Sequence, residues 1–139
     1  MIENKKAYFE YSILEKFNAG IVLVGSEIKS IRDAKTNISD AYCVLINGEM
    51  FVRNMYVAPY EKAQTPHETR RDRKLLLTKQ ELKRISNKMI DKGLTIIPLK
   101  LDINQLIKIE IGIGKGKKLY DKRESLKKKD LERESQRNN

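Results

Sequence analysis

The sequence predicts a mainly β protein, a small closed or nearly closed antiparallel barrel with flanking helices and a basic C-terminal tail. The clearest strand lies at residues 107–113, where isoleucine alternates with polar or small residues, as expected when one face is buried. Asn47-Gly48 stands between two apolar runs and predicts a tight hairpin, whose central residues must take a positive φ. Strands and helices do not alternate as in a parallel sheet, and closure into a barrel removes exposed sheet edges.

Two further strands are expected near the N-terminus. Alternation over residues 9–13 predicts a half-buried strand, with a bend or bulge where Leu14 breaks the pattern. The apolar run 21–24, bounded by Gly20 and Gly25, predicts a second and more buried strand.

Two helices are expected. Ser26 can cap the N-terminus of a short one, and Glu27 complements the positive end of its dipole. The longer one begins at Thr78, which forms a capping box with Glu81, and Gly93 supplies its stop. Its apolar stripe consists of Leu82, Ile85 and Met89.

The rest of the folded region divides into a loop and two more strands. Residues 60–74 are polar and without periodicity, which predicts a long loop. The segments 94–101 and 106–113 are apolar or alternating, with a turn expected at residues 102–105 between them. The total is about six strands and two helices.

Composition and charge limit the function. The chain has 139 residues, 40% of them hydrophobic, and a formal charge of +10, so one domain that meets a polyanion is expected. The lone Cys43 indicates a reducing compartment. The N-terminus lacks an export signal, and no apolar run reaches the roughly 18 residues of a membrane span. We therefore expect a cytoplasmic protein with no membrane partner.

The C-terminus carries a disproportionate share of the charge. Residues 115–139 hold ten Lys/Arg against five Asp/Glu, which is half of the net charge. The segment has too few large apolar residues to bury a core, but it is rich in helix formers, and Glu124–Lys128 is a favourable i,i+4 pair. We expect a barrel domain at residues 1–116 and a tail at residues 117–139 that is disordered alone and helical against a polyanionic surface.

Catalysis is not expected. His67 and Cys43 are the only residues of their kinds, and they make no metal cluster, so no metal, cofactor or catalytic residue is predicted. The segment 112–118 resembles a phosphate-binding loop, but the position that requires glycine holds Lys117. A nuclease is a rival hypothesis, but the sequence lacks the cluster of metal ligands that would support it.

Nucleic-acid binding is better supported. Basic residues cluster at Lys5-Lys6, at residues 70–74 and at residues 115–123, and each cluster is either a phosphate contact or a solvated surface. Four aromatic residues offer either base-stacking surfaces or core packing: Tyr8, Phe9, Tyr11 and Phe17. Three glycines either let the backbone approach a phosphate or release the tail from the last strand: Gly112, Gly114 and Gly116.

Several stretches together resemble the bacterial SsrA-binding protein (SmpB) family. The resemblance runs from Asn4 to Asp130 in the family's order, and its most specific run is "GKGKKLYDKR". Other matching stretches are "NKKAYFEYSILEKFNAGIVLVGSEIKSIRDAKTNISDAY", "INGEMFVRNMYVAPYE", "RRDRKLLL" and "KGLTIIPLKL".

This resemblance implies an oligonucleotide-binding-type barrel with flanking helices. It implies that the partner is the tRNA-like part of transfer-messenger RNA, which the protein delivers to stalled ribosomes, where incomplete peptides are tagged for degradation. It also implies that the tail enters the decoding centre and the empty message channel and folds there. A monomer is expected.

The functional residues expected from the resemblance and from the basic clusters form two sets. The RNA-binding set is Asn4, Lys5, Asn18, Gly20, Glu27, Lys29, Ser30, Arg32, Lys35, Arg70, Arg73, Lys74, Leu76, Lys115, Lys117 and Lys118. The tagging set in the tail is Asp121, Lys122, Arg123, Lys127, Lys128 and Lys129.

One position departs from the family pattern. The residue before "AG" is often glutamate in the family, but here it is Asn18. Asparagine donates and accepts hydrogen bonds but cannot place a carboxylate on two donors. A general RNA-binding barrel protein of the translation apparatus remains the alternative, and RNA recovered with the protein separates the two hypotheses.

Overall fold

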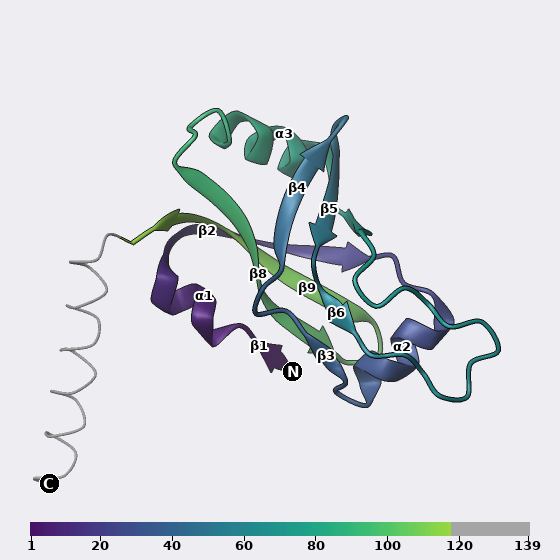
Figure 1. Cartoon of the computed structure of the whole chain (residues 1–139). Helices are drawn as coiled ribbons and strands as arrows, with labels where there is room; N and C mark the ends of the chain where they lie inside the picture. Colours follow the sequence, from purple (N-terminus) through teal and green to yellow (C-terminus); the bar gives the residue numbers. More distant parts are fainter. Residues whose placement is uncertain (118–139) are drawn as a thin grey trace, which may run out of the picture.

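In a computed structural model that describes residues 1–117, the chain forms a closed antiparallel barrel (Figure 1). The sheet order is β1-β8-β4-β5-β7-β2-β9, and β9 also pairs with β8, so six strands make a ring. These six are β2 (Tyr11–Ile21), β4 (Tyr42–Ile46), β5 (Glu49–Arg53), β7 (Arg73–Leu76), β8 (Leu94–Ile103) and β9 (Ile107–Gly116).

Shorter elements surround the ring. β1 (Ile2–Glu3) extends the sheet beside β8, and β3 (Thr36–Asn37) pairs with β6 (Tyr56–Val57) in a separate ribbon. Figure 1 shows α3 beside the β4–β5 tips and α2 at the opposite end with the β3–β6 ribbon, while α1 lies near the start of β2. The helices are α1 (Lys5–Glu10), α2 (Gly25–Arg32) and α3 (Lys79–Lys88).

Local sequence signals predicted three features correctly. Asn47 and Gly48 join β4 to β5 with φ of 51° and 78°, as the hairpin requires. The register of β2 against β9 shifts across Leu14, which confirms the bulge. The Thr78 hydroxyl oxygen accepts from the Glu81 N–H, and the Glu81 carboxylate accepts from the Thr78 N–H, so the capping box is formed.

The N-terminal strand predictions were wrong in detail. Residues 5–10 form α1, and a single long strand, β2, runs from Tyr11 to Ile21, so it contains the end of the first expected strand and only the first residue of the second. The helix forms because the Asn4 side chain caps it and also binds distant backbone, the carbonyls of Ile38 and Pro98. The apolar run beyond Ile21 leaves the sheet rather than forming a buried strand.

Other helix boundaries also differ from the expectation. The N-cap of α2 is Val24, not Ser26, and the Ser26 hydroxyl lies 2.8 Å from His67 Nδ1. α3 ends at Lys88, before Gly93, whose N–H donates to the Asp91 carboxylate at 3.0 Å. β7 was not predicted, because residues 73 and 74 lie in the expected polar loop and residues 75 and 76 belong to none of the expected elements.

The barrel interior explains the isoleucine alternation. Ile109, Ile111 and Ile113 are fully buried in the main core. Outside the barrel, α1 covers a second small cluster made by Ala7, Ile97 and Leu99. A Cβ on Gly112 would lie 2.8 Å from Leu99 Cδ1, so this glycine permits close packing and does not offer its backbone to a phosphate.

Candidate nucleic-acid interface

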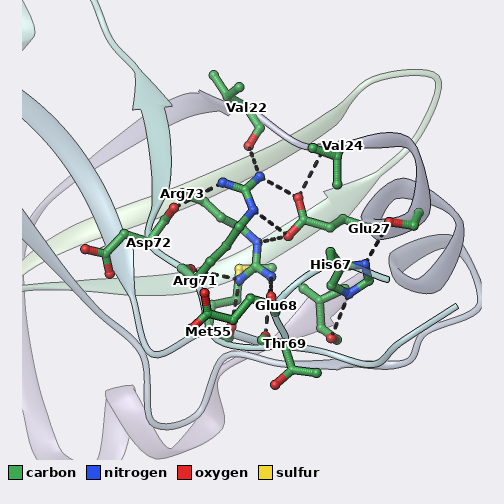
Figure 2. Close-up of polar contacts among 12 residues, drawn as sticks. Val22, Val24, Glu27, Met55, His67, Glu68, Thr69, Arg71, Asp72 and Arg73 are labelled. Carbon is green, nitrogen blue, oxygen red and sulfur yellow. Dashed lines mark hydrogen bonds and ion pairs between the residues drawn. The ribbon is translucent and has the colours of Figure 1, made fainter. Parts of the chain in front are cut away.

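The N-terminus of α2 and the loop before β7 meet at a buried ion cluster, shown in Figure 2. Glu27 is fully buried, and its carboxylate accepts hydrogen bonds from Arg71 Nε at 3.1 Å, from Arg71 Nη2 and from Arg73 Nε. It also accepts from the Val24 N–H at 2.9 Å, which ties the carboxylate to the start of its own helix. One carboxylate therefore joins the helix to two arginines far along the chain.

Arg73 extends the cluster into the loop. It is fully buried, and its remaining nitrogens donate to the carbonyl of Met55 at 2.7 Å and to those of Glu68 and Thr69 at 3.4 and 3.3 Å (Figure 2). Arg71 donates to the carbonyl of Val22 at 3.3 Å. Buried charges need such partners, because the free-energy cost of desolvating them can exceed the Coulombic attraction of an isolated ion pair.

The cluster keeps its charges near neutral pH. Burial alone would raise the pKa of Glu27, but hydrogen bonds from Arg71, from the Val24 N–H and from Arg73 outweigh it and lower that pKa. Burial lowers the pKa of Arg73, and the contact with Glu27 opposes this change. Because the ordinary arginine value lies far above 7, both partners are ionised at pH 7.

Three of the predicted cations lie on the outer surface of α2 or just after it. Lys29 Nζ lies 5.1 Å from the centre of the Tyr60 ring. Arg32 donates to the carbonyls of Asn104 and Gln105, both at 3.0 Å, and so ties α2 to the turn between β8 and β9. Lys35 is exposed just beyond the helix. The surface is basic, and two of its cations also hold neighbouring elements in place.

Arg70 lies in the loop on the same end of the barrel. Its guanidinium carbon is 5.4 Å from the centre of the Tyr56 ring, and Nη1 donates to the side-chain oxygen of Asn54 at 3.0 Å. Arginine stacked on an aromatic ring still presents donors at its edge. Sequence reasoning singled out neither Tyr56 nor Tyr60, although both lie in the matching stretch "INGEMFVRNMYVAPYE".

The outer face of β2 and β7 brings four predicted residues together. Gly20 pairs with Leu76, whose side chain is 54% exposed, and a Cβ on Gly20 would lie 3.3 Å from Leu76 Cβ. Asn18 is exposed two residues before Gly20, and Lys74 Nζ pairs with Glu49 at 3.2 Å. An exposed leucine over a glycine, flanked by polar side chains, is a surface on which a ribose or base can pack.

Four residues of the predicted RNA-binding set are buried: Asn4, Glu27, Ser30 and Arg73. Asn4 is occupied inside the protein, with Nδ2 donating to the carbonyls of Pro98 and Ile38 and Oδ1 accepting from the Ala7 N–H. The Asn4, Glu27 and Arg73 side chains are bonded inside the protein, so a role in RNA binding stays a prediction for these three and would be an indirect one. The Ser30 hydroxyl has no hydrogen-bond partner within residues 1–117, and a role for it stays a prediction as well.

Three of the remaining predicted residues lie near α1 and the end of β9. Lys5 and Lys115 are exposed. The Lys117 N–H donates to the Glu10 carbonyl at 2.8 Å, and its Nζ donates to the Tyr8 carbonyl at 3.2 Å. The others lie outside the described residues: Lys118, Asp121, Lys122, Arg123, Lys127, Lys128 and Lys129.

The described part of the chain has neither a metal-ligand cluster nor a membrane-spanning helix. Within residues 1–117, no group of three His, Cys, Asp or Glu side chains could hold a metal ion. In the same part of the chain, no helix is long and apolar enough to cross a membrane. Burial raises the pKa of the Cys43 thiol well above its ordinary value.

Comparison with known proteins decides the family. The family described as "SmpB protein" matches residues 1–139. The chain belongs to the SmpB protein family. Within that family, the chain is 55% identical to an SsrA-binding protein of Cytophaga hutchinsonii over 98% of its own length and 91% of the relative's. It is 49% identical to an SsrA-binding protein of Carboxydothermus hydrogenoformans over 95% of its own length and 90% of the relative's.

The barrel is also similar to a solved SmpB structure, described as "tmRNA-SmpB: a journey to the center of the bacterial ribosome". The TM-score is 0.70 at 42% identity, and the match covers 85% of each chain. The expected family and the antiparallel β fold with flanking helices are therefore confirmed.

Proposed function

We propose that this chain binds the tRNA-like part of transfer-messenger RNA and delivers it to stalled ribosomes for trans-translation. The observation that carries the proposal is the SmpB family match, which spans the whole chain. The net charge of +10 supports a polyanionic partner, because phosphate neutralisation dominates the affinity of proteins for nucleic acids. We expect the protein to act in the cytoplasm as a monomer, without a catalytic role.

The exposed members of the predicted set would make the RNA contacts. Lysines and arginines on α2 and in the loop before β7 would bind phosphates, and the Leu76 surface would pack against sugar or base. Buried Glu27 and Arg73 would act by holding α2 and that loop in a fixed relation. Asn4 would act in the same way on α1, which carries Lys5.

The tail, residues 117–139, would serve a separate step on the ribosome. Its Lys and Arg side chains would neutralise ribosomal RNA around the message channel, and residues 121–123 and 127–129 would be needed for tagging. A barrel that captures RNA without this tail should therefore bind transfer-messenger RNA but fail to support tagging.

RNA recovered with the full-length protein tests the proposal. We expect one discrete transfer-messenger species, identified by sequencing, and a mixture of unrelated RNAs would favour a general RNA-binding barrel instead. Lys29→Glu should weaken binding and reduce the salt slope by about one unit, as the loss of a phosphate contact does. Lys83→Glu on the exposed surface of α3 is the matched control and should bind like the wild type.

A further inference from the structure

A small pocket lies between the C-terminal end of α2 and the segment after β6. Its volume is about 220 Å³, and the lining side chains include Ser30, Asp33, Lys35, Tyr60, Glu61 and Lys62. Backbone hydrogen bonds fix its walls, from the Lys35 N–H to the Ser30 carbonyl and from the Ala58 N–H to the Lys35 carbonyl, each at 2.9 Å. A water molecule takes about 30 Å³ of liquid, so the pocket exceeds the space of one bridging water.

Ser30 supplies the observation that points to a ligand. The residue is 1% exposed, and its Oγ has no hydrogen-bond partner among residues 1–117. A helical serine can bind the carbonyl one turn earlier, but this hydroxyl makes no such bond. Buried polar groups in native proteins are almost always paired. A ligand in the pocket would provide the missing partner.

The other lining groups indicate what kind of ligand fits. Lys29 Nζ lies over the Tyr60 ring at 5.1 Å and steadies it, and aromatic rings of this kind stack against unpaired bases. Lys35 and Lys62 form no ion pair within the described part of the chain, so their ammonium groups are open to phosphates.

The acidic groups narrow the choice of base. Asp33 and Glu61 are likewise without an ion pair in residues 1–117. An ionised carboxylate only accepts hydrogen bonds, so it favours a base edge that presents adjacent N–H donors. Guanine has such an edge at N1 and N2, whereas the corresponding edges of adenine, cytosine and uracil mix donors with acceptors.

We propose that this pocket binds one unpaired guanosine nucleotide of the RNA partner. The base stacks on Tyr60 and turns its donor edge toward the carboxylates, its phosphates meet Lys35 and Lys62, and a polar group of the nucleotide pairs with the Ser30 hydroxyl. The inference rests on the proposed function and adds a base-specific contact to it.

The first test compares affinities of the full-length protein for the tRNA-like part of transfer-messenger RNA at several salt concentrations. Tyr60→Leu should weaken binding about tenfold and leave the salt slope unchanged, because stacking is lost and no phosphate contact is removed. Tyr60→Trp should keep the affinity. The matched control is Tyr42→Leu, an exposed tyrosine on β4 that lies outside the pocket and should bind like the wild type.

The second test separates binding from stability at Ser30. Ser30→Ala should weaken RNA binding without lowering the thermal stability of the free protein, because the hydroxyl has no internal partner to lose. A purely structural serine would instead lower stability. Ultraviolet crosslinking should join Tyr60 to a single unpaired guanosine, located by sequencing the crosslinked RNA.

Three results would overturn the inference. If the wild type binds this RNA selectively and the Tyr60→Leu and Ser30→Ala variants bind it as tightly as the wild type, the pocket is refuted and the proposed function stands. Tighter binding of free guanosine monophosphate than of the RNA would refute its assignment to a nucleotide within a strand. Failure of the wild-type chain to bind this RNA selectively would refute the proposed function and this inference with it.

Discussion

The two longer helices begin in the same way but are held by different forces. Each has a glutamate at its third position whose carboxylate accepts from the N–H of the N-cap residue, Glu27 from Val24 at 2.9 Å and Glu81 from Thr78 at 3.0 Å. Glu27 is fully buried and also binds Arg71 and Arg73. Glu81 is partly exposed and serves its own cap.

The rest of each helix follows the same contrast. α3 packs a buried Ile85 and a half-buried Leu82 on the core, and its C-cap residue Met89 is half-buried there too, so apolar contact fixes the position of the helix. α2 buries Ile31, but its N-terminal end joins the loop before β7 through ions. The apolar helix can lose one contact and keep its place, whereas the ionic junction fails without Glu27, because Arg73 is then buried without its carboxylate.

The largest expected effect comes from breaking the ionic junction. Glu27→Ala should lower the free energy of unfolding by about 3–5 kcal/mol, because Arg73 is left buried without its carboxylate. The measurement is a urea titration of each variant. Glu81→Ala is the matched control at the same helix position and should cost less than about 1 kcal/mol. Equal losses in the two variants would contradict the contrast between the helices.

A core substitution in α3 should come next. Ile85→Ala removes a fully buried side chain and should cost about 3 kcal/mol, within the usual range for isoleucine to alanine. Because the ion cluster at α2 is untouched, RNA affinity should change little at temperatures where the variant is folded. A loss of RNA affinity larger than that of Glu27→Ala would show that α3, and not α2, controls the RNA-binding surface.

Low pH should weaken the same ionic junction at Glu27. The pKa of Glu27 is lowered in the folded protein from an ordinary value of 4.5, so its contribution to stability is fully present above about pH 4.5. That contribution is lost as the pH falls through the folded-state pKa, when the carboxylate takes up a proton. The difference in unfolding free energy between wild type and Glu27→Ala should therefore shrink below pH 4.5. A difference that stays constant down to pH 2 would refute the assignment.

The sequence predicted the elements whose causes are local. The α3 capping box, its apolar stripe and the Asn47-Gly48 turn are each made by residues close together in the sequence, and all three are formed. The isoleucine alternation in β9 was equally readable, because a strand's buried face repeats every second residue.

The features that the sequence did not predict depend on distant partners. Asn4 caps α1 while it binds the carbonyl of Pro98, a contact that spans the chain from β1 to β8. Arg73 was predicted as an RNA-binding residue because basic residues surround it, but its carboxylate partner lies 46 positions earlier. One signal was available: in "RDRKLLL", Arg73 and Leu75 share a strand face, and Leu75 is buried.

A smaller effect is expected at the exposed cap of α3. Thr78→Ala removes the hydroxyl that accepts from the Glu81 N–H at 3.1 Å and should cost about 1 kcal/mol, the usual value for an N-cap. Thr78→Ser retains the acceptor and should restore most of the stability. Equal losses from alanine and serine would show that the threonine methyl group, and not the cap, stabilises this end of the helix.

The smallest effect is expected at the ion pair between α3 and β2. Arg84 Nε lies 2.7 Å from the Glu15 carboxylate, but the Arg84 side chain is 64% exposed, so water and salt screen the attraction. Lys88 Nζ also lies 2.6 Å from the same carboxylate and would still neutralise it in an Arg84→Ala variant. That variant should therefore lose no more than about 0.5 kcal/mol in urea titrations, and less at 1 M salt. A loss as large as that of Glu27→Ala would mean that ions hold both helices, and the distinction between an ionic and an apolar attachment would have to be abandoned.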